Sequence, residues 1–200
     1  MTKEERNALL YKPQNGLDRI SAVEEAEMND YCEQYKAFLD VSKTERECVV
    51  SAIRLAEAKG FKPYTPGMAV APGDKLYYNN RGKAIMLMLI GQKPLSEGAN
   101  IGAAHTDSPR LDLKPNPLYE DAELAYLKTH HYGGIRKYQW VTVPLELHGL
   151  VVRRDGSEVY VKIGDDPKDP QLVINDLLPH LGREQGKKPL NEAIPSETLN

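Results

Sequence analysis

The chain has 200 residues with 26 basic and 29 acidic side chains, so its formal net charge of −3 gives no overall basic field for nucleic acid or an anionic membrane. This length suffices for one good hydrophobic core or two small ones. Two cysteines do not make a disulfide scaffold, the N-terminus lacks the apolar core of a signal peptide, and the longest apolar run, residues 84–91, is too short to cross a membrane. We therefore expect a soluble, cytoplasmic protein without nucleic-acid or membrane partners.

The first part of the chain has the patterns of helices. We expect a short helix and a loop in residues 1–22, and a longer helix over residues 24–40. A further helix is expected to begin with Ser42 as its N-cap and Glu45 completing a capping box, and to end at Gly60. The helix over residues 24–40 has an apolar stripe, which we interpret as core packing and not as a cofactor-binding box: Met28, Tyr31, Tyr35, Phe38 and Leu39.

Strand patterns follow the helices. Residues 63–73 contain three prolines and two glycines and are expected to form a loop. Residues 75–78 and 83–90 read as two strands, and the Asn-Asn-Arg-Gly sequence of residues 79–82 is typical of a hairpin turn. Helices followed by a hairpin and a buried strand indicate an α/β layer, so we expect an α/β fold.

The most informative stretch is residues 100–115, with the sequence N-I-G-A-A-H-T-D-S-P-R-L-D-L-K-P. Its short apolar run, residues 101–104, predicts a buried strand. His105 and Asp107 follow two positions apart, so in an extended chain both side chains face the same side. A carboxylate beside an imidazole can fix the ring and its tautomer for metal binding. By spacing alone, His105 is more often a structural residue than a metal ligand.

Beyond this stretch the sequence predicts mostly strands. Residues 115–117, Pro-Asn-Pro, are expected to break the preceding strand. Residues 140–153 alternate between apolar and polar side chains, as in a half-buried strand, and residues 154–157 form a turn into a second strand over residues 158–163. Residues 173–181 are expected to form a short helix, and the chain after Gly182 to be polar and irregular.

The longer string G-A-A-H-T-D-S-P-x-L-x-L-K-P closely resembles the signature of the aspartyl aminopeptidase family around its first metal-binding histidine. These cocatalytic zinc metallopeptidases remove N-terminal acidic residues from peptides. The resemblance implies that His105 is a zinc ligand and that Asp107 is the catalytic-site carboxylate supporting it. It also implies a domain division, in which residues 1–115 begin an α/β catalytic domain. Residues 116–200 would then belong to an inserted β-rich domain that serves homo-oligomerisation.

The ligands that would complete a two-metal centre are not recognisable in this sequence. Such a centre needs a bridging carboxylate, further ligands and a base for water, and nothing after Lys114 matches those motifs of the family. Motifs for nucleotide binding, zincins and serine hydrolases are also absent, and no substrate-binding residue is indicated. We therefore expect the N-terminal portion of an aminopeptidase that is inactive alone. The alternative is a non-catalytic assembly or regulatory fragment that retains the oligomerisation surface.

The sequence gives weaker indications of a function for the other histidines. Adjacent residues of a strand point to opposite faces, so His130 and His131 cannot chelate one metal from an extended backbone and are expected at the surface or an interface. His148 lies on the polar face of its predicted strand and is expected to be solvated. His180 lies in a Pro-His-Leu stretch similar to one in the family, but the residues after it do not support a role in substrate contact.

Overall fold

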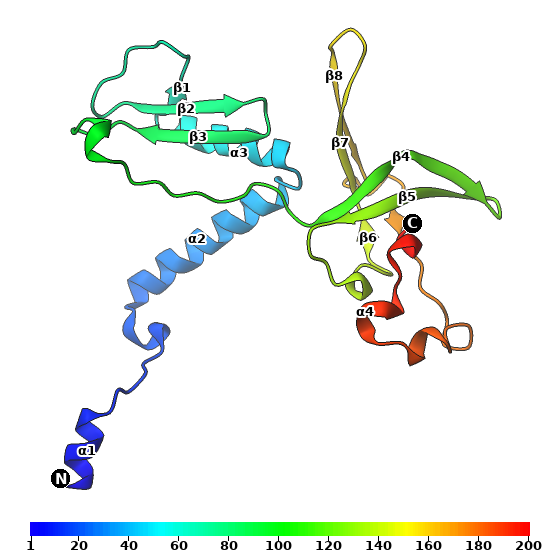
Figure 1. Ribbon diagram of the computed structural model, residues 1–200, viewed down its shortest axis with the longest axis horizontal. Coiled ribbons are helices and arrows are strands. Elements are labelled where there is room, and N and C mark those ends of the chain that lie inside the picture. The colour runs from blue at the N-terminus through cyan, green and yellow to red at the C-terminus, as the bar shows by residue number, and fades with distance from the viewer. The chain divides into compact units, whose positions relative to one another are not determined.

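The computed structural model describes residues 1–200, which divide into two compact units, residues 1–42 and 43–200. The α-helices are α1 (Lys3–Leu9), α2 (Ala22–Asp40), α3 (Glu45–Ala58) and α4 (Leu190–Ala193). The strands are β1 (Lys62–Pro63), β2 (Lys75–Asn80), β3 (Ala84–Leu89), β4 (Arg110–Asp121), β5 (Leu124–Tyr132), β6 (Pro144–Leu145), β7 (Leu147–Val152), β8 (Glu158–Ile163) and β9 (Leu172–Val173). None of the helices combines the length and apolar character that a membrane span requires. The expected mixed α/β composition is confirmed (Figure 1).

The first unit contains the two predicted helices, α1 and α2. Each begins with a capping box, formed by Thr2 with Glu5 and by Ser21 with Glu24. The apolar stripe of α2 is not core as predicted, because no residue of this helix is buried and the Tyr31 side chain is 70% exposed. Residues 1–42 contain no sheet or second long helix that could cover the stripe.

Helix α3 begins two residues later than predicted. Its N-cap is Thr44, whose hydroxyl accepts from the backbone N–H of Glu47 at 3.3 Å while the Glu47 carboxylate accepts from the backbone N–H of Thr44 at 2.9 Å. Ser42 and Glu45 have the same spacing, so the sequence offered two overlapping capping boxes and the predicted one was wrong. The predicted end is confirmed, since Gly60 follows the helix with a φ of +83°.

A three-stranded sheet lies against α3 (Figure 1). Strand β1 pairs in parallel with β2, and β2 pairs antiparallel with β3 through the predicted hairpin. Arg81 and Gly82 have φ values of 59° and 67°, as a tight hairpin turn of this kind requires. Leu76 and Tyr77 in β2 are buried, and the Tyr77 hydroxyl donates to Glu57 of α3 at 2.8 Å.

The predicted buried strand over residues 101–104 is wrong. These residues form no strand, and the Ile101 side chain is 87% exposed. A strand needs a neighbour to satisfy its backbone groups, and residues 99–109 pair with no strand of this chain. Gly102, Ala103 and Ala104 also carry little apolar surface that burial could stabilise. Residues 99–109, here called the His105 loop, therefore run as an extended connection from the first sheet to β4.

Strands β4 and β5 form a long hairpin. The predicted strand at Leu111 and Leu113 is confirmed, but the Pro-Asn-Pro sequence of residues 115–117 does not end it, because β4 continues to Asp121. The register with β5 shifts between Leu113 and Leu118. Such an irregularity places the prolines where no ladder hydrogen bond is required of them.

The last part of the chain forms two more strand pairs, β6 with β9 and β7 with β8. The β7–β8 hairpin confirms the predicted turn at residues 154–157. The strand predicted over residues 140–153 is interrupted, because Thr142 has a φ of 62°, and before Pro144 only an isolated bridge at Val141 is formed. The helix predicted over residues 173–181 is also wrong. There, β9 pairs with β6 and Ile174 bridges to Val141, which takes the chain into an extended form.

A small hydrophobic core includes the C-terminal residues of the second unit. Ile174, Ile194 and Leu199 are buried together and pack against partly buried side chains that include Trp140 and Leu145. The Thr129 hydroxyl donates to the carbonyl of Leu199. The residues after Gly182, predicted to be irregular, thus include the short helix α4 and two of the three buried core residues.

Candidate functional site

The site predicted around His105 and Asp107 lies on the exposed His105 loop. The His105 side chain is 79% exposed, whereas that of Asp107 is 35% exposed. The Nδ1 atom of His105 lies 2.7 Å from the backbone carbonyl oxygen of Asp107 and 3.2 Å from its carboxylate Oδ1. The two residues are thus in direct contact, as their i, i+2 spacing predicts, although the predicted buried strand before them is absent.

This contact determines which ring nitrogen of His105 is available to a ligand. A carbonyl oxygen accepts hydrogen bonds and cannot donate them, so the proton of a neutral His105 ring lies on Nδ1. The second nitrogen, Nε2, then carries the lone pair and makes no hydrogen bond in the structure. An imidazole held by oxygen at one nitrogen and open at the other is the usual arrangement of a metal-binding histidine.

Asp107 is also held from the β4–β5 hairpin. The hydroxyl of Tyr132, the last residue of β5, donates to Asp107 Oδ2 at 2.7 Å. This hydrogen bond is the main reason why the pKa of Asp107 lies below its ordinary value, and the nearby His105 ring acts in the same direction. The same bond raises the pKa of the Tyr132 phenol above its ordinary value. Asp107 is therefore a carboxylate and Tyr132 a neutral donor near neutral pH.

A second set of contacts holds Tyr132. The guanidinium of Arg110 lies 4.2 Å from the centre of the Tyr132 ring, within the range of a cation–π contact. Arg110 and Tyr132 are register partners in the β4–β5 ladder, and Arg110 Nε donates to Asp112 Oδ1 at 2.7 Å. After Tyr132 the chain turns at Gly133, whose φ is +76° and where a Cβ would lie 3.4 Å from Pro109. The start of β4 and the end of β5 thus form the base of the His105 loop.

The residues of this chain fit one ligand position of a zinc site. Catalytic zinc takes three protein ligands and keeps one position open, and the outward Nε2 of His105 has the chemistry of one such ligand. Within residues 1–200, no three His, Cys, Asp or Glu side chains lie close enough together to hold a metal ion. His105 thus has the chemistry of one metal ligand, and residues 1–200 contain no complete metal site.

His148, predicted to be solvated, is instead the most enclosed histidine. Its side chain is only 7% exposed, and its Nδ1 and Nε2 atoms lie 2.8 Å from Glu47 Oε1 and 2.9 Å from Glu146 Oε2. We call these three residues the His148 clamp, because Glu47 belongs to α3 and His148 to β7. The two carboxylates lie on opposite nitrogens, so they cannot share one ion with the ring between them. The prediction that His130 and His131 lie at the surface is confirmed, since both are exposed.

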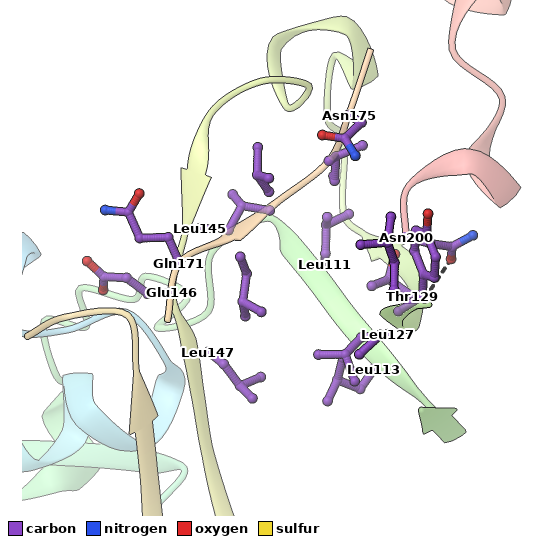
Figure 2. Close-up of a pocket in the computed structure, with 16 residues that line it drawn as sticks. Leu111, Leu113, Leu127, Thr129, Leu145, Glu146, Leu147, Gln171, Asn175 and Asn200 are labelled. Carbon is purple, nitrogen blue, oxygen red and sulfur yellow. Dashed lines mark hydrogen bonds between the residues drawn. The ribbon is translucent and has the colours of Figure 1, made fainter. Parts of the chain in front are cut away.

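A cavity of about 260 Å³ lies beside the β4–β5 hairpin and the β6–β9 pair. Figure 2 shows leucines facing it from both sides, with Leu111 and Leu113 from β4 on one side and Leu145 of β6 and Leu147 of β7 on the other. Glu146 is its only ionisable lining side chain other than Tyr126, and that carboxylate already binds His148. The cavity continues the apolar core and has no chemistry in common with the His105 site.

Sequence reasoning missed Tyr132, Arg110 and the buried state of His148. The local signal near Tyr132 is the Tyr-Gly-Gly sequence of residues 132–134, which is typical of a turn and gives no indication of a bond to Asp107. Asp107 lies 25 positions from Tyr132, and Glu47 lies 101 positions from His148. No local periodicity links residues that are so far apart.

Comparison with known proteins identifies the family. Residues 38–199 match the family described as Aminopeptidase I zinc metalloprotease (M18). A curated relative, the probable M18 family aminopeptidase 1 of Clostridium acetobutylicum, is 46% identical over 198 residues, which cover 97% of this chain and 43% of the relative. The crystal structure of an M18 family aminopeptidase from Thermotoga maritima has a TM-score of 0.83 at 39% identity, over 95% of this chain and 41% of its own.

A more distant structure, the mApe1 dodecamer of yeast, is 19% identical with a TM-score of 0.64 over 76% of this chain, and it supports the fold alone. The chain spans less than half the length of the relatives that it matches. The predicted resemblance is nevertheless confirmed by the match over most of the chain. The chain belongs to the M18 family of zinc aminopeptidases.

Proposed function

We propose that these 200 residues are part of a zinc aminopeptidase that removes N-terminal residues from peptides, with a preference for aspartate and glutamate. The preference is taken from the resemblance of the residues around His105 to the aspartyl aminopeptidases. The observation that carries the proposal is the contact between His105 Nδ1 and Asp107, which leaves Nε2 open to a metal. We place the activity in the cytoplasm.

In this proposal His105 binds zinc through Nε2, and Asp107 holds the ring through Nδ1. When bound, a pair of zinc ions would polarise the scissile carbonyl and make a water molecule nucleophilic at neutral pH. The backbone carbonyl of Asp107 accepts from the other ring nitrogen, and the carboxylate charge 3.2 Å from that nitrogen increases the basicity of the imidazole. The lowered pKa of Asp107 keeps it in the charged form that this role requires. The remaining ligands and the general base would come from sequence beyond these residues.

We further propose that residues 1–115 begin the catalytic domain and that residues 116–200 belong to an inserted domain used for homo-oligomerisation. The support is the exposed apolar character of the strands in the second part, where Val151 is 52% and Val152 60% exposed. Exposed strand edges are ready pairing surfaces. The dodecameric state of a protein with the same fold agrees with this assignment.

The test of the metal site uses a longer chain that contains these residues together with the remaining ligands. His105→Ala is expected to abolish tight zinc retention at one site, measured by metal analysis after dialysis. Asp107→Asn leaves the ligands in place and is expected to lower zinc affinity or activity by roughly 10–100-fold. His131→Ala is a matched control, because this exposed histidine lies outside the site. Full zinc occupancy in His105→Ala would refute the ligand assignment.

A second candidate function is a non-catalytic assembly or regulatory fragment. The observation that favours it is the lack of any group of three potential metal ligands within the 200 residues. Both candidates predict that the 200-residue chain alone is inactive, and they differ in whether a longer chain that contains these residues hydrolyses peptides. We expect no hydrolysis of aspartyl or glutamyl peptides by this chain, since one imidazole cannot hold a two-metal centre. Peptide hydrolysis by this chain that a chelator abolishes would contradict this expectation and exclude a non-catalytic fragment.

A further inference from the structure

Asp107 has a separate partner for each of its two carboxylate oxygens. Oδ1 lies 3.2 Å from His105 Nδ1, and Oδ2 accepts the Tyr132 hydroxyl at 2.7 Å. A carboxylate with one partner can rotate about its side-chain bonds and present either oxygen to the imidazole. The hydrogen bond from Tyr132 to Oδ2 opposes that rotation, because rotation would break it, and it therefore holds Oδ1 beside the imidazole.

Tyr132 is suited to fix that orientation, because it is itself anchored on a regular element. It is the last residue of β5, paired in register with Arg110 of β4. The Arg110 guanidinium covers its ring at 4.2 Å and is itself bonded to Asp112. The His105 loop, by contrast, makes no strand pairing. The Tyr132 hydroxyl is therefore a link from a hydrogen-bonded hairpin to a loop that lacks regular structure.

We propose that Tyr132 is a positioning residue of the zinc site, whose hydroxyl holds Asp107 in place, so that the carbonyl and the carboxylate of this residue keep the His105 proton on Nδ1 and direct Nε2 to the metal. The inference rests on the proposed function for the part that concerns zinc. Tyr132 itself touches neither metal nor substrate in this arrangement. It acts through Asp107, and Asp107 acts through the imidazole.

Tyr132→Phe isolates the role of the hydroxyl. Phenylalanine keeps the ring that Arg110 covers, and Tyr132 is 41% exposed, so no buried group loses a partner other than Asp107. The matched control is Tyr126→Phe on the same strand. Tyr126 stacks on Tyr119 with ring centres 5.1 Å apart, and its hydroxyl makes no hydrogen bond to the His105 loop.

The first readout needs no metal and uses the 200-residue chain. Long-range proton–nitrogen NMR spectra at pH 8.5 distinguish the two neutral tautomers of His105, with His105→Gln assigning its signals. We expect the Nδ1–H tautomer to predominate in the wild-type chain and in Tyr126→Phe, and the Nε2–H form to gain in Tyr132→Phe. Identical His105 ring signals in all three proteins would overturn the proposal.

The second readout is the zinc dissociation constant of the longer chain, measured by competition with a chelator. We expect Tyr132→Phe to weaken zinc about tenfold, the lower end of the range for groups that support a ligand, and Tyr126→Phe to leave the constant unchanged. Unchanged zinc affinity in Tyr132→Phe would overturn the proposal. The two hypotheses fail in different ways. If the addition of zinc does not change the His105 ring signals of the wild-type protein, the ligand assignment fails. The comparison of tautomers still decides whether Tyr132 orients the ring.

Discussion

Removal of the His148 side chain tests whether the His148 clamp stabilises the second unit. The change His148→Leu fills the space of the ring but removes both ring nitrogens and their contacts with the two carboxylates. Glu47 and Glu146 would then keep their charges without a shared partner. The side chain of His148 is 7% exposed, whereas those of Glu47 and Glu146 are 27% and 37% exposed. Only the imidazole is therefore fully enclosed, and the carboxylates can regain some water.

The expected loss of stability follows from these contacts. A hydrogen bond to a charged group contributes about 1.5–3 kcal/mol to the free energy of unfolding. Two such bonds are lost, and partial exposure of both carboxylates favours the lower end of that range for each. We therefore expect His148→Leu to lower the free energy of unfolding by about 3 kcal/mol. The exposed His131 provides the control, and His131→Leu is expected to change it by less than about 0.5 kcal/mol.

Urea denaturation of the 200-residue chain measures both changes, and a double-mutant cycle isolates one contact. Glu47→Gln keeps a side chain that can serve the capping box with Thr44, so it removes mainly the charge that faces His148. We expect a coupling energy between Glu47 and His148 of about 1–2 kcal/mol. A coupling energy near zero, together with a wild-type urea midpoint for His148→Leu, would refute the idea of a clamp.

The pH dependence gives an independent check with a definite sign. Burial alone would raise the pKa of Glu47, but the hydrogen bond and charge of His148, with the bonds from Thr44, outweigh it and hold this pKa below its ordinary value of 4.5. A group with a lowered pKa in the folded state stabilises the protein above its ordinary pKa. This stabilisation is lost as the pH falls below that value. His148→Leu should therefore show a weaker loss of stability between pH 5 and pH 3 than the wild type, in the same urea titrations.

Three further predictions concern other parts of the chain. Thr44→Ala should lower the free energy of unfolding by about 1 kcal/mol in urea titrations, whereas Ser42→Ala should not, because only Thr44 caps α3. Gly133→Ala should cost about 1–2 kcal/mol through its positive φ, and equal stability of Gly133→Ala and the control Gly134→Ala would contradict that reasoning. Light scattering should detect oligomers that depend on the hairpin within residues 140–163, and a monomer at all concentrations, for this chain and for a longer form, would refute the assignment.

Turn and cap chemistry made the local elements predictable. The hairpin turn at Arg81 and Gly82, the end of α3 at Gly60 and the β7–β8 turn each depend on a few adjacent residues. Overlapping local signals were less decisive, since Thr44 and Ser42 both had a glutamate three positions later. The prolines at 115 and 117 were wrongly predicted to end the strand, because a shift of register allowed the strand to continue past them.

Burial and distant contacts were not predictable from local pattern. The apolar residues of α2 and Ile101 have the periodicity of buried segments, but burial requires a second surface, and none covers them in their own part of the structure. Within the candidate site, the contact of His105 with Asp107 follows from two-residue spacing and was predicted. Tyr132 and the clamp partners of His148 are distant in sequence, so only the folded chain reveals them.

The distance in sequence between the clamp partners also governs the order of folding. The hydrogen bond between Glu47 and His148 closes a loop of 101 positions. Closing such a loop in a flexible chain costs about 4 kcal/mol of entropy from its length alone, more than one hydrogen bond returns. We therefore expect the clamp to form after α3 and the β2–β3 and β4–β5 hairpins, which lie between its partners in the sequence, have shortened the path between them. For a contact that forms after the transition state, we expect its loss to accelerate unfolding and to leave the folding rate nearly unchanged.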